Sequence, residues 1–97
     1  MEENLRILFH ILNDHYKDAK MLFNYAKEVK GSGDKEMVKY LIDNATIRLS
    51  YFKEVKQKID YLLKGADMQN PYYLFYDNFI KNADELYKEI SDFSKTN

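Results

Sequence analysis

Apolar residues in the first third of the chain recur at alternating intervals of three and four positions, as they do along one face of an amphipathic helix. The series continues for almost four heptads, with a single polar member at His15. Its members are Leu5, Leu8, Leu12, His15, Ala19, Leu22, Ala26 and Val29. A seam of this length is typical of helices that pack against another helix, so the pattern predicts a helix over about residues 4–30.

The same spacing returns in the second third of the chain, again with one polar member, Arg48. The members of this second series are Val38, Leu41, Ala45, Arg48, Phe52, Val55, Ile59 and Leu62. They predict a helix over about residues 35–64. The stretch between the two series, 31–34, reads Gly-Ser-Gly-Asp. Glycine commonly ends a helix and Asp34 is suited to cap the next one, so the sequence predicts a helical hairpin.

A third apolar face begins after Pro71, a residue that favours the first position of a helix. Its members are Tyr72, Tyr76, Phe79, Ala83, Leu86, Ile90 and Phe93. They predict a helix over about residues 71–93, joined to the second helix by the short connection Ala66–Asn70. Because short connections make neighbouring helices antiparallel, we expect an all-α fold with one domain over residues 1–97. This domain would be an antiparallel three-helix bundle built on the long helical hairpin, and dimerisation would complete a larger bundle.

The two polar members of the seam fall close together when the hairpin is folded about its turn. Pairing the two series position by position places Ala19 opposite Arg48 and His15 opposite Phe52. Asp18 lies at the edge of the apolar stripe, and the small Ala19 leaves room for a long side chain. A carboxylate is the best partner for a guanidinium that is removed from water, so we expect a contact between Asp18 and Arg48.

His15, Asp18 and Arg48 therefore form a candidate ligand-binding layer, for which two interpretations are open. A polar layer in a helical seam commonly fixes the register, and Arg48 can lay its stem on the core with its charge in water. Alternatively, the layer binds a small molecule, an anion or a metal. Long helices with tyrosine and polar insertions loosely resemble ferritin-like bundles. The Glu-x-x-His pairs of those metal sites are absent, so we expect no metal and no cofactor.

A run of large apolar residues after Pro71 is the clearest surface signal in the sequence. These residues cannot all face one core from a single helix, and two apolar residues of the first helix are also surplus to the seam. The candidate interface residues are Tyr73, Leu74, Phe75, Ile7 and Met21. Exposed apolar groups of this kind often mark a protein interface. The alternative is that the run covers the open end of the bundle, against the leucines at 5, 62 and 63.

Composition narrows the classes of function. With no cysteine among its 97 residues, the chain has no disulfide, thiolate metal site or cysteine nucleophile. A net charge of −1 argues against a protein that works through nucleic-acid phosphates or an anionic membrane. No apolar run is long enough to span a bilayer, and the N-terminus lacks the pattern of a signal peptide, so we expect a cytoplasmic protein.

The sequence carries no catalytic motif: it has no phosphate-binding glycine loop and no context for a nucleophile triad. We therefore expect a non-enzymatic interaction module that acts through self-association or by binding a partner helix. The predicted partner is a protein or a second copy of the chain, with a homodimer as the expected assembly. The alternative is a helical bundle that binds a small molecule, an anion or a metal through its polar layer.

Overall fold

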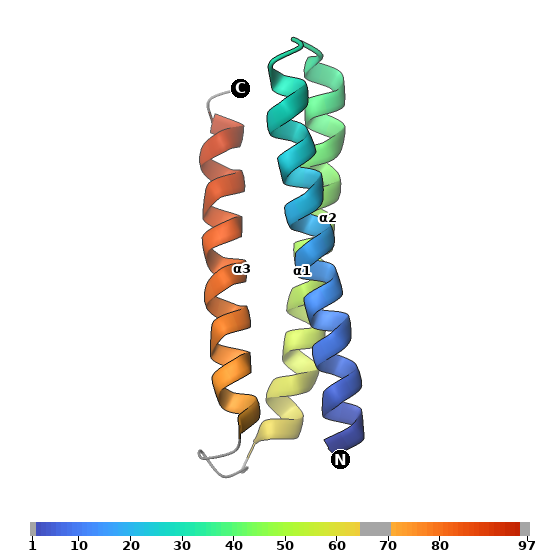
Figure 1. Cartoon of the computed structure of the whole chain (residues 1–97), viewed down its shortest axis with the longest axis vertical. Helices are drawn as coiled ribbons and strands as arrows, with labels where there is room; N and C mark the ends of the chain where they lie inside the picture. Colours follow the sequence, from blue (N-terminus) through green and yellow to red (C-terminus); the bar gives the residue numbers. More distant parts are fainter. Residues whose placement is uncertain (1, 65–70, 96–97) are drawn as a thin grey trace.

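The computed structural model describes residues 2–64 and 71–95, and it describes side chains over 3–64 and 74–95. The described residues form three helices, α1 (Glu2–Lys30), α2 (Lys35–Leu63) and α3 (Pro71–Lys95). Successive helices run in opposite directions in a rod with extents of 50 × 19 × 16 Å (Figure 1). The all-α bundle and its hairpin are thus confirmed. Within the described ranges, no helix is both long enough and apolar enough to cross a membrane.

The helix ends follow the capping signals in the sequence. Asp34 caps α2, since its side chain accepts a hydrogen bond of 3.0 Å from the Met37 backbone N–H. Gly33 has a φ of 83°, a left-handed conformation that glycine adopts without steric cost. Lys64 ends α2 with extended backbone, so the helix stops one residue earlier than predicted. The predicted connection, Ala66–Asn70, lies outside the described residues.

The backbones of α1 and α2 run close together, because small residues occupy the centre of the seam between them. Along one line of this seam, every seventh residue of each helix is buried. The line, which we call the inner column, contains Leu5, Leu12, Ala19 and Ala26 of α1 and Val38, Ala45, Phe52 and Ile59 of α2. Alanines at three of these positions let the helices approach, and the large residues fill the space toward the open end of the hairpin.

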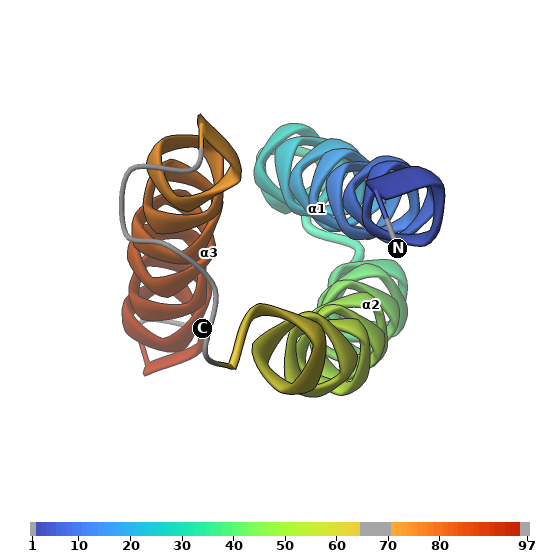
Figure 2. The same cartoon turned by 90° about the horizontal axis from the view of Figure 1, so that it is seen from below.

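The helix α3 stands farther from the hairpin and is attached through large side chains (Figure 2). Phe9 of α1 makes an edge-on contact with Tyr76 at 6.0 Å between ring centroids and a stacked contact with Phe79 at 6.1 Å. At the other end of α3, Phe23 meets Phe93 edge-on at 5.4 Å. Aromatic pairs in these geometries add to the stability that burial alone provides. The bundle is therefore a close hairpin with a third helix spaced off it by aromatic rings.

A polar contact also fastens α3 to α2. The Tyr76 hydroxyl donates a hydrogen bond to Asp60 Oδ1 and lies 3.2 Å from the Lys56 carbonyl oxygen, while Lys56 Nζ is 3.0 Å from Asp60 Oδ2. Burial and the Asp60 carboxylate raise the pKa of Tyr76 well above its ordinary value. Burial pushes the pKa of Asp60 upward, but the hydrogen bonds from Tyr76 and Lys56 outweigh it and lower that pKa below 3.8. Folding thus favours the neutral tyrosine and the ionised carboxylate.

We expect Tyr76→Phe to lower the free energy of unfolding by about 1 kcal/mol near neutral pH, because the variant loses a hydrogen bond to a partly exposed carboxylate. This deficit should shrink above pH 10.0, where Tyr76 ionises in the unfolded state but keeps its proton in the folded state. It should also shrink below pH 3.8, where Asp60 becomes protonated. Urea denaturation followed by circular dichroism measures the difference, and a deficit that stays constant between about pH 3 and pH 11 contradicts the expectation.

Candidate functional site

The structure brings the predicted polar layer together at the middle of the hairpin. Arg48 Nη1 lies 3.9 Å from Asp18 Oδ2, which confirms the predicted contact. Both side chains are 43% exposed, however, and no charged side chain in the described residues is fully buried. The guanidinium of Arg48 therefore stays near the surface, in agreement with the interpretation in which its charge remains in water. An ion pair this exposed contributes at most about 1 kcal/mol to stability.

His15, the third member of the layer, is half-buried and packs against an aromatic ring. Its ring centroid is 5.5 Å from that of Tyr51, one residue before the Phe52 that the register predicts. Phe52 itself turns into the core. The Nδ1 atom of His15 is buried and has no hydrogen-bond partner. The layer thus holds an ion pair at the surface and a buried imidazole nitrogen without a hydrogen-bond partner.

The layer also marks the junction between two parts of the core. The cluster toward the open end of the hairpin includes Leu12 and Phe52, and the cluster toward the turn includes Ala19 and Leu49. Tyr16 packs against both clusters. In the ranges 2–64 and 71–95, no group of three or more histidine or acidic side chains is placed to hold a metal ion.

The four predicted interface residues whose side chains are described lie at separate places on the surface. Leu74 and Phe75 are exposed, as predicted, at 73% and 61%. Phe75 lines a groove between α3 and α1, whereas Ile7 lines a different groove between α1 and α2. Met21 lies farther along α1, among Lys17, Lys20 and Tyr25. The side chain of Tyr73 is outside the described residues. Tyr76 joins Leu5 and Leu63 in the core at this end, as the apolar face of the third helix predicts under both interpretations.

The structure divides the predicted seam into two lines with different burial. The second line, which we call the outer column, contains Leu8, His15, Leu22 and Val29 of α1 and Leu41, Arg48, Val55 and Leu62 of α2. All eight of its side chains are only half-buried, whereas all eight of the inner column are buried. In a complete bundle both lines of a heptad seam are covered. The outer column is therefore a row of core positions without a helix over it.

The outer column lies on the side of the hairpin that faces away from α3. The aromatic rings of α1 that contact α3, Phe9 and Phe23, belong to the opposite flank of the seam. Figure 2 shows α3 to one side of the hairpin. Exposed apolar side chains continue the column on both helices, at the spacing of one helical face. They are Ile7, Ile11 and Tyr25 of α1 and Ile47, Tyr51 and Tyr61 of α2. We call these residues and the outer column together the outer face.

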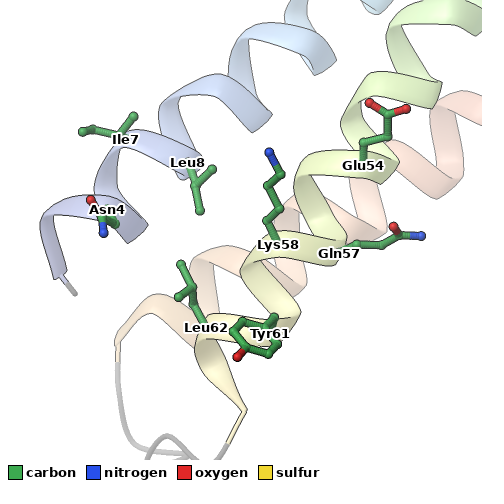
Figure 3. Close-up of a pocket in the computed structure, with 8 residues that line it drawn as sticks. All are labelled: Asn4, Ile7, Leu8, Glu54, Gln57, Lys58, Tyr61 and Leu62. Carbon is green, nitrogen blue, oxygen red and sulfur yellow. The ribbon is translucent and has the colours of Figure 1, made fainter.

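A groove opens on the outer face near the free end of the hairpin. It has a volume of about 730 Å³, and Figure 3 shows Leu8 of α1 and Leu62 of α2 projecting into the space between the helices. Ile7 and Tyr61 lie at its sides, and the side chain of Lys58 places a positive charge in its lining. The sequence contained a signal for this surface, since Ile11 and Tyr25 widen the apolar stripe on the flank away from Phe9 and Phe23.

Comparison with protein-family models, with curated proteins and with solved structures finds no match to the chain.

Proposed function

We propose that the chain is a non-enzymatic interaction module whose outer face binds a helix or helical hairpin of a protein partner. The observation that carries this proposal is the outer column: eight heptad core positions along the whole hairpin are only partly buried. A fourth helix laid along the groove would cover these positions, as helix-in-groove recognition does elsewhere.

The balance of polar and apolar groups on the outer face supports this function. Apolar side chains extend to both ends of the hairpin, and the charged member of the seam, Arg48, lies at its middle beside Asp18. Glu54 and Lys58 lie beside the groove near the free end. Apolar contact provides most of the free energy of binding, while one polar layer selects the register and the partner. The same layer that interrupts the seam in the monomer would thus act as a specificity element in a complex.

Photo-crosslinking tests whether a polypeptide covers the outer face. Benzoylphenylalanine, a photoreactive analogue of tyrosine and phenylalanine, replaces Tyr51 of the outer face in cells that naturally produce the chain. The matched control replaces Tyr87 of α3, which is also an exposed tyrosine. We expect discrete protein adducts from position 51 and none above background from position 87, because only the first would lie under a bound helix.

The size of each adduct gives the mass of the molecule that covers the face, and any single polypeptide, including the chain itself, supports the function. If position 51 yields no protein adduct, or if both positions yield the same adducts, then the outer face is not a binding surface and the proposal fails.

A further inference from the structure

We infer that the occupant of the outer face is a second copy of this chain, so that two hairpins pack face to face around a two-fold axis. This inference rests on the proposed function and names its partner. The core of the assembly would contain α1 and α2 of each copy, and the two α3 helices would lie on the outside, each on its own hairpin.

The first argument is that the outer face is complementary to itself. Its polar layer holds one acidic and one basic side chain, Asp18 and Arg48, and lies near the middle of both α1 and α2. When two copies meet, the layer of one faces the layer of the other, whether the two-fold axis runs along the helices or across them. Each carboxylate then has a guanidinium of the partner within the same layer, and apolar ends meet apolar ends. A two-fold interface requires this kind of self-complementarity.

The second argument is the amount of surface that the single chain leaves exposed. Its accessible surface is 6953 Å². A folded monomer of 11.7 kDa ordinarily exposes about 5,900 Å². The excess is of the same size as the roughly 800 Å² that each partner loses in an interface of standard size. Pairing of two copies along the outer face would bury an area of this size, on the side of the hairpin where core positions are exposed.

The third argument is electrostatic. The net charge of the chain is −1, so two copies repel each other only weakly at neutral pH. The outer face also carries both signs along its edge, with Glu54 and Lys58 one helical turn apart beside the groove. A face with charges of a single sign would instead require a partner of opposite charge.

Sedimentation velocity and light scattering on the purified full-length chain test the inference. We expect a mass twice the 11.7 kDa of the chain at micromolar concentrations. Ile11→Glu and Ile47→Glu each place a charge on the outer face, one from each helix of the hairpin. Each should raise the dimer dissociation constant by about a hundredfold or more, because the charge would be buried without a partner. Circular dichroism establishes that each variant keeps its helical fold.

Leu74→Glu is the matched control, since Leu74 is exposed on α3 away from the hairpin seam. It should leave the dissociation constant unchanged within about threefold. A wild-type chain that is monomeric up to about millimolar concentration overturns the inference. So does a dimer that resists both isoleucine variants, or one that Leu74→Glu dissociates. If the chain is monomeric while position 51 crosslinks to a different protein, this inference fails and the proposed function stands. If position 51 crosslinks to nothing, the proposed function itself fails.

Discussion

Replacing Phe9 by alanine should lower the free energy of unfolding by about 3–5 kcal/mol, the largest loss that we expect from any single substitution. Phe9 is buried, and its ring contacts both Tyr76 and Phe79 of α3. Because α3 stands off the hairpin, few atoms are positioned to move into the space that the ring leaves. The loss should therefore combine the lost burial of an aromatic ring with a cavity that relaxes poorly.

The loss of stability in Phe9→Ala should also differ among the three helices. Hydrogen exchange of backbone amides should become faster in α3 than in α1 and α2, because α3 depends on a few aromatic contacts whereas the hairpin has a continuous seam. Phe75→Ala is the control, since Phe75 is mostly exposed, and it should cost less than about 1 kcal/mol. Equal acceleration of exchange in all three helices after Phe9→Ala would show that the bundle unfolds as one unit, contrary to this description of α3.

The parts of the fold that follow from local pattern could be predicted from the sequence. The three helices, the turn with its Asp34 cap and the register of the hairpin all depend on spacing or on residues a few positions apart. The register also placed Asp18 beside Arg48, because matching two long seams leaves few alternatives. The heptad pattern was sufficient for the helices and for the level of the ion pair, whereas the turn and its cap followed from Gly33 and Asp34. The register was one residue out for His15, which contacts Tyr51 and not Phe52.

Other features depend on which side of the hairpin α3 occupies, and the pattern of α1 and α2 does not determine this. Both flanks of the seam carry large apolar side chains, Phe9 and Phe23 on one and Ile11 and Tyr25 on the other. Because α3 covers the flank of Phe9, the outer column on the other flank stays exposed and forms the outer face. The exposure of Arg48 has the same cause, because its side chain belongs to the uncovered half. The bond between Tyr76 and Asp60 likewise joins segments whose pairing no local motif indicates.

Leu12→Ala should lower the free energy of unfolding by about 3 kcal/mol, because Leu12 is completely buried in the inner column. Leu74→Ala makes the same chemical change at a leucine that is 73% exposed, and it should alter stability by less than about 0.5 kcal/mol. Urea denaturation followed by circular dichroism measures both at one protein concentration, since assembly shifts apparent stability. A loss below about 1 kcal/mol for Leu12→Ala would contradict the position of the core.

Leu22 allows the same substitution to be made in the outer column, where its cost in stability should depend on protein concentration. Leu22 is half-buried in the single chain, so Leu22→Ala should cost about 1 kcal/mol at concentrations below the dissociation constant of the proposed dimer. Above that concentration the second copy would cover Leu22, and the cost should rise toward that of Leu12→Ala. The cost of Leu12→Ala should not change, because Leu12 is already buried within its own chain. A cost for Leu22→Ala that is independent of concentration would mean that nothing covers the outer column in solution.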